Sequence, residues 1–371
     1  MKGNESDYDV IIVGSRIAGS LTGILLGEKG YQVLVLDRAH FPSDTLSTHF
    51  FRAAALRAFS VVGVYDEVQA AAPHATVNFN VIDGIAFAEP VDRPEDYPFY
   101  MCVRRITLDD ILVRRLKEVH NVKMIEGARV NALMEEGGKI VSVGWKEKSG
   151  PKIASARVVI GADGVRSFVA KEVKAFSEYA EPVNRAMYYA YFSGVKHKEG
   201  PAAEFHYRGN NIAYVMACDG DLSMLAVSVP IEKFPGFKRD PEGKLMQELG
   251  AMTEIAARLP NVHRQSSVLG SGSIPCYMRI PYGYGWVLVG DAGMAMDPWS
   301  GQGIDQASTH AVSLAKYLGD FLSGERDWKA SMEAYYKDRN EVSMKAYRRT
   351  RKFGRDLRPM TREALAKRGL V

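Results

Sequence analysis

Glycines and an acidic residue near the start of the chain have the spacing needed to bind a dinucleotide. A short β-branched run at 10–13 ends at Gly14, an apolar helix is expected over 18–29, and a second strand over 31–36 ends at Asp37. This pattern predicts a βαβ unit. The N-terminus of its helix offers free N–H groups to a pyrophosphate, and Asp37 is placed to bind a ribose.

The turn departs from the usual dinucleotide pattern at one position. Gly14 and Gly19 occupy the first and last glycine positions, but Arg16 stands where the middle glycine is expected. That glycine normally allows the backbone to approach the phosphates closely. The Arg16 side chain must therefore point away, or reach over the phosphates as a counter-charge. A βαβ crossover that binds no ligand is the alternative interpretation.

Two later segments repeat the pattern of a strand that ends in a glycine-flanked acid. In the first, a strand over 157–160 leads into Gly161, Asp163 and Gly164. A tight turn with a helix N-cap would also explain Asp163. In the second, a strand over 286–289 ends at Gly290 and Asp291, and a helix expected from 301–303 to about 321 offers another N-terminus.

The loop after Asp37 is a further candidate, because ligands in open α/β sheets bind beyond the carboxyl ends of the strands. Pro42 and Ser43 indicate a loop, and apolar spacing predicts a helix over 46–59. Ser47, Thr48 and His49 could then face a cofactor. A helix-start histidine with a satisfied ring is an equally good reading of His49.

The remaining elements indicate an α/β fold with an α+β insertion. A hairpin over 76–87 and consecutive strands over 186–229 predict an antiparallel sheet, rich in Tyr, Phe and Met, that walls an apolar pocket or simply forms core. The strand pleat leaves open which residues face the pocket. Helices are expected over 245–259 and from 328 onward, with Pro359 as a break. We therefore expect a Rossmann-like domain (1–75, 99–183 and 262–325), a substrate domain (76–98 and 184–261) and a C-terminal helical region (326–371).

Composition is that of a soluble globular enzyme, with 371 residues, 46% hydrophobic and 25% charged. No run approaches the roughly 18 apolar residues of a membrane span, and residues 1–9 lack the apolar core of a signal peptide. The three cysteines lie far apart and form no metal-ligand spacing, so we expect a cytoplasmic protein without a metal.

The net charge of +4 is unevenly distributed. Residues 335–371 contain twelve Lys or Arg and four Asp or Glu, a balance of +8, so the rest of the chain carries −4. A basic tail of this kind can touch a membrane or another partner, but a solvated helix surface is the better interpretation. No nucleic-acid partner is expected.

Taken together, the three motifs resemble a known family. GSRIAG, GADGVRS and VGDAGMAMDPWSGQG occur in the order found in the flavin-dependent monooxygenases of the p-hydroxybenzoate hydroxylase type, group A enzymes with a glutathione-reductase-like FAD fold. The resemblance spans about 9–321. The loop FPSDTLSTH and the arginine at position 16 are similar to a bacterial subgroup of FAD-dependent oxidoreductases.

This resemblance implies a set of cofactor contacts. Arg105 matches an arginine at the flavin phosphate or ribityl chain, Val130 matches a strand position at adenine, and Asp163 with Arg166 matches a motif for FAD and NAD(P)H. Asp291 matches the acid at the ribityl chain. The complete set of implied FAD-binding residues is Gly14, Ser15, Arg16, Ile17, Ala18, Gly19, Asp37, Arg38, Arg105, Val130, Asp163, Gly290, Asp291, Gly301, Gln302, Gly303 and Ile304.

The implied reaction uses NAD(P)H to reduce FAD and O2 to form a flavin 4a-hydroperoxide, which hydroxylates or epoxidises an apolar, aromatic or polyketide-like molecule of secondary metabolism. His49, Trp299 and Pro298 are the expected catalytic-site residues, His49 and Trp299 orienting the substrate. Five side chains of the antiparallel sheet are expected to close the far side: Tyr188, Tyr189, Tyr191, His206 and Tyr214.

Other activities on the same fold remain alternatives. Flavin halogenases rely on an early lysine and a WxWxIP motif, but no lysine occurs between Lys29 and Lys117 and no such tryptophan pair is present. Geranylgeranyl-type reductases, which act on C=C bonds, often have a cysteine after the second strand, and residues 43–51 contain none. A non-catalytic flavoprotein is the alternative outside enzymes.

Overall fold

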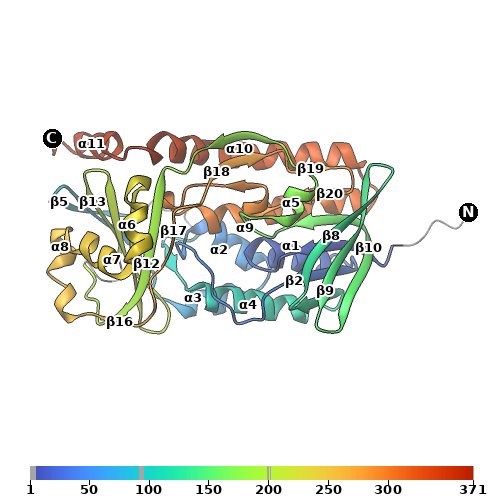
Figure 1. The fold of residues 1–371 in the computed structure, drawn as a ribbon, viewed down its shortest axis with the longest axis horizontal. Coiled ribbons are helices and arrows are strands. Elements are labelled where there is room, and N and C mark those ends of the chain that lie inside the picture. The colour runs from blue at the N-terminus through green and yellow to red at the C-terminus, as the bar shows by residue number, and fades with distance from the viewer. Residues whose placement is uncertain (1–5, 92–95, 199, 201, 371) are drawn as a thin grey trace, which may run out of the picture.

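The computed structural model of the protein, shown in Figure 1, describes residues 6–91, 96–198, 200 and 202–370. Residues 1–5 of the N-terminal stretch and residues 92–95 of the expected substrate domain lie outside the described residues. The expectations that concern them are therefore not addressed by the structure.

The first sheet is built around β1 (Tyr8–Val13), with the strand order β19-β20-β10-β1-β2-β7. β1 pairs in parallel with β2 (Val33–Asp37) and β10 (Gly150–Gly161), and α1 (Ile17–Glu28) connects β1 to β2. Val10, Ile11 and Ile12 are fully buried, as expected for a β-branched strand covered on both faces. The predicted βαβ unit is confirmed.

A separate apolar cluster packs on each face of this sheet. α1, α4 (Arg105–Glu118) and α9 (Gly303–Leu322) pack in one apolar cluster with Val10 and Ile12. Ile11 and Val13 point to the other face, where β9 (Lys139–Glu147) contributes Val143 and Trp145 and β8 (Arg129–Glu136) contributes Leu133. The first sheet is thus held between two separate apolar cores.

The second sheet has the order β16-β12-β15-β14-β13-β4-β5, with β17 (Leu269–Ser271) on β12. Its strands are β4 (Val77–Ile82), β5 (Ile85–Pro90), β12 (Arg185–Ser193), β13 (Ala202–Arg208), β14 (Asn211–Ala217), β15 (Ser223–Pro230) and β16 (His263–Arg264). The strands expected over 186–229 pair antiparallel, which confirms that part of the prediction, and β4 adds to β13 in parallel. The hairpin β4–β5 joins the sheet by this pair.

The pleat of the second sheet sorts its aromatic residues into two groups. Tyr189, Tyr191 and Tyr214 face a cluster shared with Trp299. Tyr188 points to the opposite face, where it stacks on Phe237 of α6 with ring centroids 4.3 Å apart. His206 also lies away from that cluster. The expectation that all five side chains close the pocket was therefore wrong for Tyr188 and His206, since neighbours in a strand alternate faces.

His206 belongs instead to a buried charged group on that opposite side. Glu204 accepts hydrogen bonds from His206 Nε2 (3.0 Å) and from two nitrogens of Arg258 (2.9 and 2.7 Å). Glu204 and His206 are almost completely buried, so these bonds replace lost hydration. This group holds β13 to the segment that follows α8.

A long C-terminal helix runs beside both sheets (Figure 1). α10 (Trp328–Gly354) packs on α9, and Phe353 near its end joins the cluster of the second sheet. The helical region is interrupted at 355–357, close to the break expected at Pro359, and α11 (Arg358–Ala366) follows with Pro359 in its first turn. No helix among the described residues combines the length and apolar character needed to cross a membrane.

The remaining elements connect these layers. They are β3 (Phe50–Phe51), α2 (Ala53–Val61), α3 (Tyr65–Ala71), β6 (Met101–Cys102), β7 (Val122–Glu126), α5 (Phe168–Glu172), β11 (Ser177–Glu181), α6 (Phe234–Arg239), α7 (Pro241–Gly250), α8 (Thr253–Ala256), β18 (Cys276–Arg279), β19 (Tyr282–Gly283), β20 (Trp286–Leu288) and β21 (Met294–Ala295).

Two predicted helices differ from the structure. The helix expected over 46–59 begins only at Ala53, because residues 50–51 form β3 and pair with β6. The helix expected over 245–259 is divided into α7 and α8. In the first case a long-range strand pair replaced a local preference, which apolar spacing does not reveal.

Candidate active site

The dinucleotide turn is tightly packed against the second motif. Gly14 has φ +98°, and a Cβ on it would lie 2.5 Å from the carbonyl oxygen of Ala162. A Cβ on Gly19 would lie 1.9 Å from the Gly14 carbonyl oxygen. Both positions therefore require glycine. Ser15, Ile17 and Ala18 are buried around the turn.

The third motif also contacts this turn. Gly290 has φ +60°, and a Cβ there would lie 2.8 Å from the Cβ of Ala18. β20 and β10 are parallel neighbours, so their carboxyl ends reach the same edge of the sheet as β1. The structure thus brings the three motifs, which are far apart in the sequence, into one site.

Asp37 closes the turn from the end of β2. Its carboxylate accepts hydrogen bonds from the backbone N–H (2.7 Å) and hydroxyl (3.0 Å) of Ser15, and from the N–H of Ala39 (2.8 Å). Arg38 beside it is exposed. Val130 is half-buried on β8, two residues after Ala128, whose N–H binds the Asp37 carbonyl (2.8 Å). The roles of Asp37, Arg38 and Val130 at FAD stay predictions.

Arg16 is held by contacts within the protein, and its position relative to a bound pyrophosphate stays a prediction. Its guanidinium donates to the carbonyls of Ser43 and Asp44 (both 3.1 Å) and forms an ion pair with Asp109 on α4. It also lies over the ring of Phe41, 5.4 Å from its centroid. Arg16 therefore ties the first turn of α1 to the 41–44 loop and to α4.

Arg105 shares the same carboxylate. It binds Asp109 through two hydrogen bonds of 2.9 Å, one turn along α4. Asp109 is fully buried, so two cations neutralise one buried anion and leave a net positive charge near the start of α1. Sequence reasoning missed Asp109, although its position four residues after Arg105 is a signal for such a pair.

Asp163 makes the contacts of a helix-capping residue. Its carboxylate accepts from the N–H groups of Phe168 (2.6 Å) and Val169 (3.2 Å) at the start of α5, and from the Ser167 hydroxyl. Burial raises the pKa of Asp163. Arg166 is exposed and donates to Ser273 (3.3 Å). These are the contacts of the capping alternative, and a role for Asp163 at FAD stays a prediction.

Asp291 differs from these acids because no hydrogen bond to its carboxylate is seen among the described residues. Asp291 is exposed to solvent. Desolvation by the surrounding protein still raises the pKa of its carboxyl to about 6, against the opposing charge of Arg105. An acid that lacks a protein partner is available to a ligand.

The start of α9 is partly open. A Cβ on Gly303 would meet no atom within 4 Å, and Gln302 is half-exposed, whereas Ile304 is buried. Gly301 is held from behind by Arg52, which donates to its carbonyl (2.9 Å) and pairs with Asp305 (2.9 Å). The free N–H groups of this helix start face a space that the protein does not fill.

His49 is a buried and conformationally strained residue. Its φ is +60°, which a non-glycine residue adopts at a cost of about 1–3 kcal/mol. Its Nε2 lies 2.7 Å from the Tyr191 hydroxyl, and its Nδ1 has no partner among the described residues. Burial, followed by the charge of Arg105, lowers the pKa of His49 to about 3, so the ring is neutral near pH 7.

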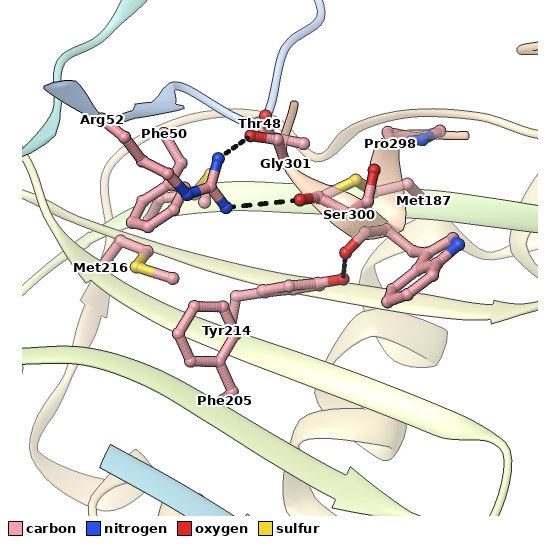
Figure 2. A pocket seen from close by; sticks show the side chains of 12 residues that line it. Thr48, Phe50, Arg52, Met187, Phe205, Tyr214, Met216, Pro298, Ser300 and Gly301 are labelled. Carbon is pink, nitrogen blue, oxygen red and sulfur yellow. Dashed lines mark hydrogen bonds between the residues drawn. The ribbon is translucent and has the colours of Figure 1, made fainter. Parts of the chain in front are cut away.

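A small apolar cavity lies between the second sheet and the start of α9 (Figure 2). Its lining comprises Thr48, Phe50, Arg52, Met187, Phe205, Tyr214, Met216, Met224, Pro298, Trp299, Ser300 and Gly301. The Tyr214 hydroxyl donates to the Trp299 carbonyl (2.7 Å), as Figure 2 shows. Pro298 and Trp299 thus line the cavity as expected, but the His49 ring does not line it and instead meets Tyr189 and Tyr191.

Glycine-dependent turns, a helix N-terminus and an adjoining apolar cavity at the carboxyl ends of parallel strands define a nucleotide-dependent oxidoreductase of the α/β class. Comparison with protein families gives the finer assignment. A model described as "FAD binding domain" matches residues 7–200 and 277–350. The chain belongs to this family, which confirms the resemblance of the three motifs and makes the protein an FAD-dependent oxidoreductase.

Characterised relatives on this fold carry out several reactions. The chain is 23% identical to a 1H-pyrrole-2-carbonyl-[peptidyl-carrier protein] brominase of Pseudoalteromonas luteoviolacea, covering 88% of this chain and 81% of the relative. It is 25% identical to a digeranylgeranylglycerophospholipid reductase of Methanopyrus kandleri, covering 90% and 86%.

Solved structures show the same fold. The myxobacterial chondrochloren halogenase CndH has a TM-score of 0.85 at 21% identity, covering 92% of this chain and 81% of that one. PqsL, a probable FAD-dependent monooxygenase from Pseudomonas aeruginosa, has a TM-score of 0.79 at 20% identity, covering 94% and 95%.

Proposed function

We propose that the protein is an FAD-dependent monooxygenase that uses NAD(P)H and O2 to hydroxylate or epoxidise a neutral apolar or aromatic small molecule. The observation that carries this proposal is the apolar cavity against the start of α9. A cavity in this place is where a substrate would meet the reacting edge of a flavin held by the three motifs.

The residues present fit FAD. Gly14 and Gly19 leave no room for a side chain, so the backbone of the turn is free to approach a pyrophosphate. Arg16 and Arg105 supply a net positive charge next to it. The Asp291 carboxylate has no hydrogen-bonding partner among the described residues and is available to hydroxyls of a ribityl chain. When bound and reduced, FAD supplies the activation of O2 and the oxygen transfer.

The protein itself would bind and orient the substrate and exclude water from it. Most of the cavity wall is apolar, and its charged member, Arg52, is neutralised by Asp305. The Tyr214 hydroxyl is already used by Trp299. A substrate carboxylate would therefore find no free cation, whereas a neutral ring would be surrounded by Met and Phe side chains.

His49 and Tyr191 form a hydrogen-bonded pair beside the proposed active site. Burial raises the pKa of Tyr191 far above its ordinary value, so its hydroxyl remains protonated and bonds to a neutral imidazole. We infer that the pair positions the 45–49 segment at the cavity rim, through Thr48, and that His49 acts as a positioning residue.

The proposal is tested with the FAD-loaded protein and a panel of neutral phenols and indoles. Ligands that increase NADH or NADPH oxidation are then turned over under labelled oxygen gas, and products are analysed by mass spectrometry. We expect one labelled oxygen atom per product. Stimulated NAD(P)H oxidation that yields products without label would overturn the monooxygenase proposal.

Halogenation is the second candidate, because the brominase and the halogenase CndH share the fold over most of the chain. Against it, no lysine lies between Lys29 and Lys117, and the cavity lining contains none. Adding chloride or bromide to the same assay separates the two reactions, since a halogenase would yield halogenated products. A hydrogenated product obtained without O2 would favour the C=C reductase alternative.

A further inference from the structure

Two cysteines that are far apart in the sequence lie side by side in the structure. Cys102 is in β6 and Cys218 follows β14, 116 residues later, yet their sulfur atoms are 3.3 Å apart. Both are free and almost completely buried. Cys276, the third cysteine, belongs to a different cluster with Met278 and Tyr347.

The backbone on both sides of the pair is fixed. Asp219, next to Cys218, accepts hydrogen bonds from the N–H (2.7 Å) and Nε (2.9 Å) of Arg104 and from the Thr107 hydroxyl (2.6 Å). The Cys218 N–H binds the Leu222 carbonyl (2.7 Å). Cys102 pairs with Phe50 of β3. These contacts fix the backbone on both sides, so the two thiol groups are kept close to each other.

A small oxidant has space next to one of the thiols. A second small cavity is lined by Cys102, Met101, Met216, Phe50 and four further residues. Phe50 and Met216 also line the apolar cavity of the proposed active site, so the two spaces adjoin. Burial raises the pKa of Cys102, so the thiol must lose its proton before its sulfur can react, and its oxidation by peroxide is slow.

We propose that Cys102 and Cys218 are a redox-modification site, at which a peroxide converts the two thiols to a disulfide. Cys102 sulfur attacks one peroxide oxygen, the O–O bond breaks, and sulfenic acid and one water form. Cys218 sulfur then displaces the hydroxyl, which leaves as a second water, and an S–S bond forms. The thiols lose two electrons and two protons, and hydrogen peroxide is reduced to two waters.

The bond would connect β6, which pairs with β3 just before α4, to the β14–β15 turn of the second sheet. The sulfurs must approach from 3.3 Å to about 2.05 Å, a short movement between fixed segments. Because the closed loop is long, the unfolded chain is strongly constrained and the folded state is stabilised. Reduced flavin is a peroxide source only if the proposed function holds, so the test supplies peroxide from outside.

The test is thiol counting on the full-length, FAD-loaded protein after treatment with hydrogen peroxide. We expect the count under denaturing conditions to fall from three to one, and peptide mapping to show Cys102 linked to Cys218. Dithiothreitol should restore all three thiols. The melting temperature should rise on oxidation and return on reduction.

Single alanine variants are the matched controls. Cys276→Ala should still form the link, with the count falling from two to zero, whereas Cys102→Ala and Cys218→Ala should form none. If a variant does not fold, mapping of the parent protein still decides the question. Three free thiols after treatment, a link that includes Cys276, or Cys102 oxidised without a link would overturn the proposal.

Discussion

Among the acidic residues around the dinucleotide turn, all but Asp291 have hydrogen-bonding or ion-pair partners within the described part of the protein. Asp109 is fully buried and neutralised by Arg16 and Arg105. Asp37 and Asp163 accept backbone N–H groups. Asp291 is exposed and has no such partner among the described residues, yet desolvation by the surrounding protein raises its pKa to about 6. At the scale of the residue, we therefore predict that Asp291 lowers folding stability and contributes to FAD binding.

The first prediction is that Asp291→Asn weakens FAD binding but stabilises the protein without FAD. Loss of a charge-assisted hydrogen bond of roughly 1.5–3 kcal/mol lowers affinity about tenfold to a hundredfold. Because the pKa of Asp291 in the folded protein is raised above its ordinary value of 3.8, its stability contribution is present below about pH 4 and is lost as pH rises through about 6.

This prediction is checked by FAD titration and by urea unfolding of the apoprotein. The stability gain of Asp291→Asn should be largest at pH 7.5 and shrink toward pH 4. Asp221→Asn is the control, since Asp221 lies in an exposed turn with a positive φ that Asn tolerates. Equal FAD affinity of the parent and Asp291→Asn would contradict the placement.

The second prediction concerns Arg16. Arg16→Gly restores the usual glycine but removes one cation, so FAD affinity should fall by about tenfold at low salt and depend less on ionic strength. FAD titrations at several salt concentrations test this, with Arg114→Gln on the outer surface of α4 as the control. Unchanged affinity at every ionic strength would mean that Arg16 only holds the 41–44 loop.

At the scale of the element, the site depends on strand faces and helix starts. One face of β12 and β14 supplies Met187, Tyr214 and Met216 to the cavity, while the alternate residues pack under α6 and α7. The 298–300 segment closes the cavity just before α9 begins. Trp299 joins this segment to α10, since its ring N–H donates to the Thr350 carbonyl (3.2 Å).

The third prediction is that Trp299→Ala uncouples NAD(P)H consumption from product formation more than it slows flavin reduction. Removing the ring enlarges the cavity and admits water next to the flavin, whereas the FAD contacts of the three motifs stay in place. The ratio of product to NAD(P)H consumed is compared with the rate of anaerobic flavin reduction. Trp299→Phe, which keeps the cavity smaller, should lie between the parent and Trp299→Ala. A parallel loss of both quantities in Trp299→Ala would argue against this role.

At the scale of the whole molecule, buried histidines lie where the layers join. His49 meets the second sheet through Tyr191, and His310 of α9 bonds to Ser343 of α10 (2.8 Å). Burial lowers the pKa of each to about 3. Unfolding exposes these rings and lets them take up protons at a higher pH, near 6.5. The junctions between layers are thus sensitive to acid.

The fourth prediction is that stability falls as pH drops below about 6.5 toward 3, because the unfolded chain binds protons that the folded protein excludes. Urea unfolding of the FAD-loaded protein at pH 7.5 and pH 5 measures the loss. His310→Gln should reduce the difference between the two pH values, even if it lowers stability overall. His120→Gln, at an exposed position, should leave the difference unchanged. A pH dependence that His310→Gln does not alter would refute the assignment.

Much of the nucleotide-binding part was predictable from the sequence. Gly14, Gly19, Asp37 and Gly290 occupy the positions expected of a βαβ unit and its neighbouring strand, because the turn leaves no space for a Cβ and β-branched runs specify buried parallel strands. The three co-ordered motifs were sufficient to predict the FAD-binding family. These features are local, so the sequence specifies them within a few residues.

The tertiary structure alone decided the long-range features. It brought Arg16 to Asp109, turned Tyr188 away from the cavity while Tyr189 faces it, and placed Cys102 against Cys218. It also replaced the start of a predicted helix by the β3–β6 pair, which leaves His49 at φ +60°. Each outcome depends on which distant segment packs on a given face, and neither spacing nor propensity within one segment carries that information.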